Sequence, residues 1–112
     1  IIVDAAMNDL IRPALYQSHH EIVPVEEPSA EQQMLADVVG PVCETGDFLA
    51  RNRQMPPVSP GALMSISTAG AYGFVLSSNY NSRPRVPEVL VEGSAWRIIR
   101  RRETLEDLIR GE

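Results

Sequence analysis

The apolar residues of this 112-residue sequence lie in short runs, which prolines and polar turns interrupt. The run 35–43 is rich in valine and apolar except at Asp37, so it predicts a central strand that leads into a loop. The run 1–3 predicts a short buried strand. The run 21–25 predicts an edge strand, because proline at position 24 cannot donate a hydrogen bond to a sheet. Short strands therefore dominate the chain, and its helices are short.

The remaining patterns extend this interpretation. Residues 63–67 alternate as in a strand, and the runs 89–92 and 95–99 flank Gly93-Ser94, which predicts a hairpin with a type II′ turn. Helical turns are predicted at 10–16, at 47–52 and after Thr104. The first is expected to be entered through Asn8 or Asp9, and Thr104 is expected to cap the last one. The segment 26–33 is predicted to be a surface loop. The predicted fold is mainly β, an antiparallel sandwich or barrel-like domain with short helices.

Composition limits the possible functions. With 44% hydrophobic and 22% charged residues the chain is predicted to be one soluble globular domain, and its net charge of −5 argues against nucleic acid as the main partner. A single cysteine favours the reducing cytoplasm, and no apolar run is long enough for a membrane. All ten basic residues are arginine, so chemistry that needs a lysine amine must take it from elsewhere. The start at Ile1 resembles a piece cut from a longer polypeptide.

The single cysteine, Cys43, lies between Gly40 and Asp47 with Glu44 beside it. Two neighbouring carboxylates disfavour the thiolate, so they are expected to raise the pKa of the thiol. Such a thiol is a weak nucleophile and is suited to donating a proton. The alternative is a half-buried cysteine at a corner between a strand and a loop.

Two further groups of side chains are suited to binding a ligand. Arg12 and Tyr16 are one helical turn apart, and a guanidinium with a phenol can hold one carboxylate. Tyr72 stands between Gly70 and Gly73, where it could stack on a flat ring or bond a phosphate oxygen. The alternatives are tyrosines packed into the core. The adjacent pair 19–20 of histidines lacks further ligands at suitable spacing, so no metal is expected.

Taken together and in order, these segments resemble the C-terminal domain of bacterial diaminopimelate decarboxylases. The resemblance rests on 4–16, on the cysteine loop 40–47, on 69–73 and on 79–84, and it extends over essentially all 112 residues. It implies a two-domain enzyme in which residues 1–112 are the β-domain and an N-terminal β/α-barrel lies outside this chain. It also implies pyridoxal 5′-phosphate as cofactor, conversion of meso-2,6-diaminopimelate to L-lysine, and active sites at a homodimer interface.

The resemblance further implies a role for each candidate residue. Arg12 and Tyr16 match positions that hold a substrate carboxylate, and Glu44 matches the carboxylate that recognises the distal amino end of the substrate. Cys43 matches a cysteine that reaches into the active site of the partner subunit. Tyr72 matches a tyrosine that contacts the cofactor.

The cofactor-binding lysine would belong to the barrel, so this domain alone is expected to be inert. Two alternatives stay open. One is a related pyridoxal-phosphate-dependent decarboxylase that acts on arginine, ornithine or a carboxylated polyamine. The other is a β-domain that serves only for dimerisation, without catalysis.

Overall fold

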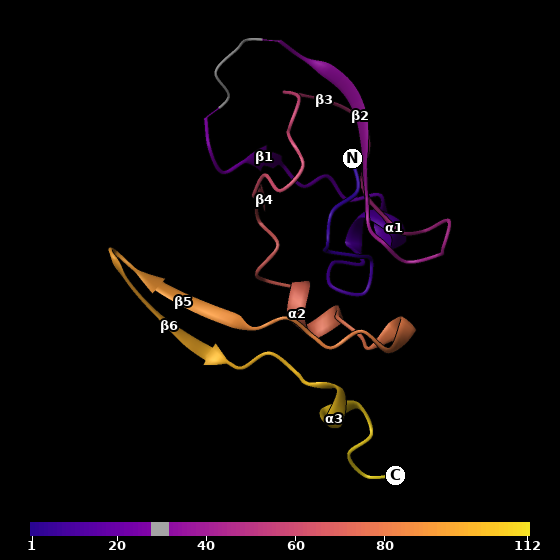
Figure 1. The fold of residues 1–112 in the computed structure, drawn as a ribbon, viewed down its shortest axis with the longest axis vertical. Helices are drawn as coiled ribbons and strands as arrows, with labels where there is room; N and C mark the ends of the chain where they lie inside the picture. The colour runs from indigo at the N-terminus through magenta and orange to yellow at the C-terminus, as the bar shows by residue number, and fades with distance from the viewer. Residues whose placement is uncertain (28–31) are drawn as a thin grey trace.

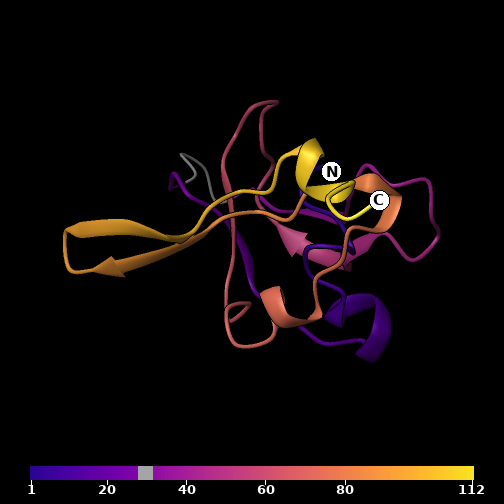
Figure 2. The ribbon, with the colours of Figure 1, turned by 90° about the horizontal axis from the view of Figure 1, so that it is seen from below.

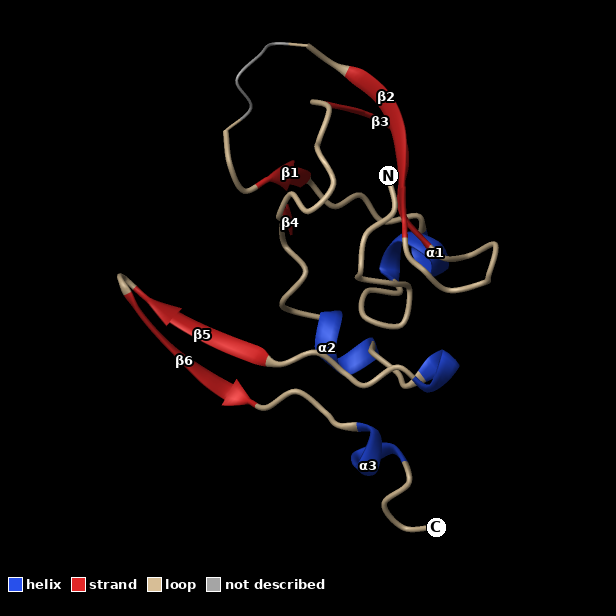
Figure 3. Ribbon diagram, in the orientation of Figure 1, coloured by secondary structure: helices blue, strands red, loops and turns tan. Residues whose placement is uncertain are grey.

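The computed structural model describes residues 1–27 and 32–112, so part of the predicted surface loop 26–33 lies outside the described residues. Its strands pair two by two in three antiparallel sheets, and its helices are single turns (Figures 1 and 3). The strands are β1 (Ile22–Pro24) with β4 (Met64–Ile66), β2 (Met34–Val39) with β3 (Phe48–Met55), and β5 (Glu88–Glu92) with β6 (Ala95–Arg100). The helices are α1 (Arg12–Tyr16), α2 (Gly73–Leu76), the 3-10 helix η1 (Tyr80–Ser82) and α3 (Leu105–Leu108). The predicted mainly antiparallel β fold with short helices is confirmed, and no described helix is both long and apolar enough to cross a membrane.

The core is built from residues of the β1–β4 and β2–β3 pairs. Its buried members come from both pairs and from the segment before α1: Leu10, Ile22, Val38, Leu49, Ala50 and Met55. The predicted central strand has neighbours on both sides only at the end of β2. There Val39 pairs with β3 on one side and exchanges hydrogen bonds with the backbone of Ile1 and Val3 on the other. The prediction of a buried strand at 1–3 is wrong for Ile2, whose side chain is exposed.

The predicted helical turn at 47–52 is wrong, since β3 begins at Phe48 and pairs with β2. Pairing with a valine-rich strand buries Leu49 and Ala50, and this gain outweighs local helical preference. The pairing also explains the polar residue in the apolar run: Asp37 Oδ1 accepts a hydrogen bond of 2.7 Å from the amide of Asn52, which has a left-handed backbone. The register between the two strands shifts at this point.

Helix α1 begins at Arg12 with Ile11 as its N-cap, so the predicted entry through Asn8 or Asp9 is wrong. Asp9 instead caps the preceding turn, where its Oδ2 accepts from the amide of Ala6 at 2.9 Å. Pro13 occupies the first turn of the helix as predicted, because its missing N–H has no partner to lose there. At α3 the predicted cap is confirmed, since Thr104 forms a capping box.

The β5–β6 hairpin projects from the rest of the molecule (Figure 2). Its turn has Gly93 at φ +63°, as the predicted type II′ turn requires. The Cα radius of gyration is 15.2 Å, against about 13 Å for a compact chain of this length. The register places Val91 opposite Trp96 and Val89 opposite Ile98, so one face of the hairpin is apolar, yet all four side chains are exposed.

Candidate functional site

The loop from Gly40 to Asp47 holds its shape through one buried carboxylate. Asp47 is only 4% exposed, and its two oxygens accept hydrogen bonds from the backbone amides of Val42 at 2.6 Å and of Met7 at 2.7 Å. Gly40 lies against this carboxylate, where a Cβ would come within 2.4 Å of Oδ2 and 2.7 Å of the carbonyl oxygen of Ala5. A closed loop follows, with Cys43 and Glu44 at its exposed tip.

The thiol of Cys43 is exposed, so the alternative of a half-buried structural cysteine is wrong. The two carboxylates that the sequence places near it have other partners. Asp47 binds backbone amides, and Glu44 Oε2 accepts a hydrogen bond of 3.1 Å from the hydroxyl of Tyr80. That Cys43 donates a proton stays a prediction.

Sequence reasoning missed Tyr80, which lies in η1. Its hydroxyl donates to Glu44. This hydrogen bond, together with the negative charge of the carboxylate, raises the pKa of Tyr80 above its usual value, because both disfavour the phenolate. The signals in the sequence were the polar, turn-rich character of the segment 79–85 and the family resemblance of 79–84. Nothing in that pattern identified a partner from the cysteine loop.

Arg12 and Tyr72 form a second group. The Cζ atom of Arg12 lies 5.3 Å from the centre of the Tyr72 ring, within the range of a cation–π contact. Tyr72 is 57% exposed and Tyr16, one turn along α1 from Arg12, is 61% exposed. The alternative of inward-packed tyrosines is therefore wrong at both positions. The phenols and the guanidinium are available to a ligand.

The candidate residues thus form two groups, Arg12 with Tyr16 and Tyr72, and Cys43 with Glu44. Within residues 1–27 and 32–112, no hydrogen bond, ion pair or cation–π contact joins one group to the other. The two histidines have separate partners: His20 Nδ1 lies 3.1 Å from the carbonyl oxygen of Ser67, and His19 Nε2 lies 3.4 Å from Glu21.

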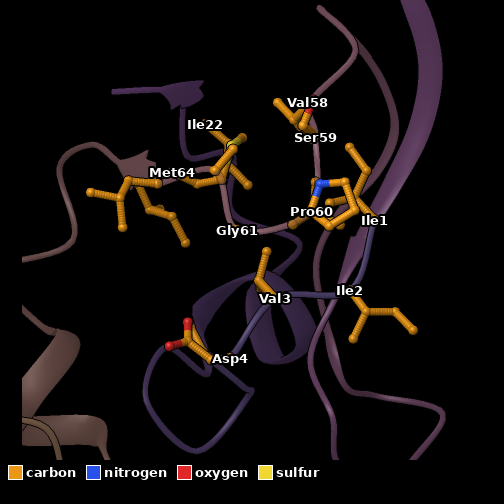
Figure 4. A pocket seen from close by; sticks show the side chains of 15 residues that line it. Ile1, Ile2, Val3, Asp4, Ile22, Val58, Ser59, Pro60, Gly61 and Met64 are labelled. Carbon is orange, nitrogen blue, oxygen red and sulfur yellow. The ribbon is translucent and has the colours of Figure 1, made fainter. Parts of the chain in front are cut away.

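A hollow of about 610 Å³ lies elsewhere, beside residues 1–4 (Figure 4). Its walls are mostly apolar and include Val3, Ile22, Val58 and Met64, whereas none of the candidate site residues lines it. Apolar walls do not suit a substrate with several charged groups. The hollow therefore does not connect the two groups of candidate residues.

Comparison with known proteins identifies the family. The family model described as "Pyridoxal-dependent decarboxylase, C-terminal sheet domain" matches residues 1–70. The chain belongs to this family. The sheet domain is 56% identical over all 112 residues to the diaminopimelate decarboxylase of Zymomonas mobilis, of which it covers 26%. Its fold resembles the crystal structure of AQ1208 from Aquifex aeolicus, with a TM-score of 0.94, 51% identity, and coverage of 97% of this chain and 27% of that one.

A third comparison concerns a solved structure with a small molecule. The sheet domain matches the Helicobacter pylori diaminopimelate decarboxylase complexed with L-lysine with a TM-score of 0.87 and 44% identity, over 96% of this chain and 26% of that one. The chain thus spans about a quarter of the length of the relatives that it matches. The segment 1–70 contains Arg12, Tyr16, Cys43 and Glu44, whereas Tyr72 lies just beyond it.

The family depends on a pyridoxal cofactor, and the side chains of the sheet domain fit a supporting role toward it. Tyr72 offers an exposed phenol, and Arg12 places a guanidinium over its ring. A phenol and a guanidinium suit a phosphate or carboxylate oxygen. A lysine amine for a covalent link is absent from these 112 residues, since all ten basic residues are arginine.

Proposed function

We propose that this chain is the C-terminal β-domain, residues 1–112, of a diaminopimelate decarboxylase that converts meso-2,6-diaminopimelate to L-lysine and CO2. The observation that carries the proposal is the 56% identity to one such enzyme along the whole chain. The resemblance of the fold to a diaminopimelate decarboxylase complexed with L-lysine also supports it. The N-terminal barrel of the same enzyme then supplies the lysine that this chain lacks.

Arg12 and Tyr16 are proposed to hold a carboxylate of the substrate. They lie one turn apart on α1, and both tyrosine and guanidinium are within reach of solvent. A guanidinium presents two parallel N–H groups to a carboxylate, and the phenol adds a third donor. The carboxylate meant here is the one that is not lost as CO2. Because it keeps its charge throughout the reaction, these contacts orient the substrate for the loss of CO2.

Glu44 and Cys43 are proposed to act in the active site of the partner subunit. Both lie at the exposed tip of a loop that Asp47 closes, and no described contact joins them to Arg12 or Tyr72. Glu44 provides a carboxylate for the distal ammonium of the substrate. Cys43 provides a thiol proton for the carbon that has lost its carboxylate.

Tyr72 is proposed to contact the cofactor with its exposed phenol, beside Arg12. When bound, pyridoxal phosphate delocalises the electron pair that CO2 leaves behind. Tyr72 keeps one side of that group in place, and Arg12 lies over the Tyr72 ring. Because the cofactor lysine lies outside the chain, the isolated domain is expected to be inert.

Two partners follow from the proposal, the barrel of the same polypeptide and a second subunit in a homodimer. The apolar face of the β5–β6 hairpin supports this proposal, because its Trp96 is 69% exposed. Exposed apolar faces of this kind are usually covered by another domain or subunit. The single exposed cysteine agrees with a reducing cytoplasm. No role for nucleic acid, membrane or metal is proposed.

The test uses the full-length enzyme, with its upstream barrel, and measures CO2 release from meso-2,6-diaminopimelate, arginine, ornithine and a carboxylated polyamine. Release from meso-2,6-diaminopimelate alone is expected. Arg12→Ala and Glu44→Ala should each lower kcat/KM about 10- to 100-fold, because each loses hydrogen bonds to a charged group. The matched controls Arg102→Ala and Glu92→Ala, at exposed positions, should leave kcat/KM within twofold of the wild type.

Mixing subunits tests whether the site is shared. Arg12→Ala and Glu44→Ala subunits carry their defects in different groups, so a hybrid dimer has one intact site. Random exchange in a two-fold symmetric dimer should restore about a quarter of the wild-type activity. No recovery on mixing would contradict the assignment of Glu44 to the partner's site.

Each alternative predicts a different result. A related decarboxylase would release CO2 from arginine, ornithine or the polyamine in preference to meso-2,6-diaminopimelate. For a β-domain that serves only dimerisation, Arg12→Ala, Cys43→Ala and Glu44→Ala would change stability alone.

A further inference from the structure

The segment 77–85, which the proposed function leaves without a role, is anchored by several hydrogen bonds to residues near the N-terminus. The amide of Ser78 donates to the carbonyl oxygen of Asn8 at 3.0 Å, and Asn8 Nδ2 donates back to the carbonyl oxygen of Ser78 at 3.3 Å. Arg83 Nε donates to Asn8 Oδ1 at 2.9 Å, and its Nη2 donates to the carbonyl oxygen of Asp4 at 2.6 Å. The segment is thus tied to the turn before α1.

The same segment has a strained backbone directly after Tyr80. Asn81 and Ser82 have φ values of 58° and 56°, in the left-handed region. Asparagine tolerates this region, whereas serine disfavours it. Strain of this kind persists only where surrounding contacts maintain it, and it is typical of functional positions. Tyr80 directly precedes these two residues, and Arg83, with its hydrogen bonds to Asn8 and Asp4, directly follows them.

Tyr80 in turn contacts the tip of the cysteine loop. Its hydroxyl donates to Glu44 Oε2 at 3.1 Å, although the two residues lie in different loops. A glutamate at an exposed loop tip would otherwise sample several rotamers. A tyrosine hydroxyl is protonated at neutral pH, and the raised pKa of Tyr80 acts in the same direction, so the hydroxyl remains a donor.

We propose that Tyr80 is a positioning residue, which holds the carboxylate of Glu44 in the orientation that receives the ammonium of the substrate. This inference rests on the proposed function for Glu44. One hydroxyl occupies one lone pair of the carboxylate, so the other oxygen and the remaining lone pairs stay free for the ammonium. In this role Tyr80 acts through Glu44 and not on the reacting carbon.

The test is Tyr80→Phe in the full-length enzyme, which removes only the hydroxyl and keeps the ring. The KM for meso-2,6-diaminopimelate should rise about tenfold while kcat stays within twofold, because the lost contact orients a group away from the reacting carbon. The Kd for L-lysine, measured by isothermal titration calorimetry, should rise by the same factor. The thermal midpoint should stay within about 2 °C of the wild type, since Tyr80 is a partly exposed side chain.

A double-mutant cycle with Glu44→Gln distinguishes positioning from an independent contact. In the Glu44→Gln background, Tyr80→Phe should raise KM by less than about twofold, because the carboxylate that Tyr80 orients has already been removed. An unchanged KM for Tyr80→Phe in an enzyme that decarboxylates meso-2,6-diaminopimelate overturns the positioning role alone. Additive effects of the two substitutions overturn it as well. A wild-type enzyme that releases no CO2 from meso-2,6-diaminopimelate overturns the proposed function, and the positioning role with it.

Discussion

Substitution of Asp47 tests whether the shape of the cysteine loop depends on one buried carboxylate. Its oxygens accept from the amides of Met7 at 2.7 Å and Val42 at 2.6 Å, and the side chain is 4% exposed. Asp47→Asn preserves the size and shape of the side chain. It replaces one acceptor oxygen with an NH2 group, which then faces a backbone N–H. One of the two amides, the buried one of Val42 or the partly buried one of Met7, therefore loses its partner.

The expected cost follows from that loss. A buried donor without a partner costs about 1–3 kcal/mol, so Asp47→Asn should destabilise the loop by this amount and Asp47→Ala, which frees both amides, by about 2–5 kcal/mol. Glu44→Gln is the matched control, because it makes the same chemical change at the tip of the same loop. Since Glu44 is exposed, its stability change should stay below about 0.5 kcal/mol.

Hydrogen exchange of the full-length enzyme, followed by mass spectrometry, measures the effect locally. The segments that contain the amides of Met7 and Val42 should exchange about 5- to 150-fold faster in Asp47→Asn, which corresponds to about 1–3 kcal/mol. Exchange at the wild-type rate in these segments would refute the reasoning. So would an equal acceleration by Glu44→Gln, because the buried position of Asp47 would then be irrelevant.

Three further predictions concern other parts of the domain. Hydrogen bonds from the amide of Arg85 and from Asn79 lower the pKa of Glu103. Its contribution to stability is therefore complete above the unfolded-state pKa of 4.5 and is lost as the pH falls through the lower folded-state pKa. In thermal denaturation, the melting temperature of the wild type should approach that of Glu103→Gln as the pH falls below about 4.5. Trp96→Glu should leave the circular dichroism of the domain unchanged but weaken assembly of the full-length enzyme in analytical ultracentrifugation. Leu49→Ala, at a side chain that is 1% exposed, should cost about 2–5 kcal/mol in urea denaturation.

Elements set by neighbouring residues could be predicted from the sequence. The turn at Gly93 and the cap at Thr104 depend on a few consecutive residues, and the structure has both. Strand β3 could not be predicted, because its pairing partner β2 lies before the cysteine loop and the bulge at Asn52 depends on Asp37. The local pattern at 47–52 contains no information about that partner.

Candidate residues that are neighbours in the sequence could be grouped in advance, as Arg12 was with Tyr16. The contact between Arg12 and Tyr72 could not be predicted. Arg12 meets Tyr72 only because α1 and the start of α2 come together in space. Asp47 was interpreted as a carboxylate acting on the thiol, whereas the structure places it on the backbone. Whether a carboxylate faces a thiol or an amide depends on the path of the loop, which residue types do not specify.

The hydrogen bond between Glu44 and Tyr80 also could not be predicted from residue types. It depends on the turn before α1, which contacts both loops. Met7 binds the carboxylate that closes the cysteine loop, and Asn8 binds the segment that carries Tyr80. One short turn therefore fixes both loops, although none of its residues was a candidate for chemistry. Asn8 is buried with its polar atoms satisfied by Ser78 and Arg83, which is the arrangement expected of a residue that sets geometry. The orientation of the proposed substrate-binding carboxylate thus depends on residues that bind only other parts of the protein.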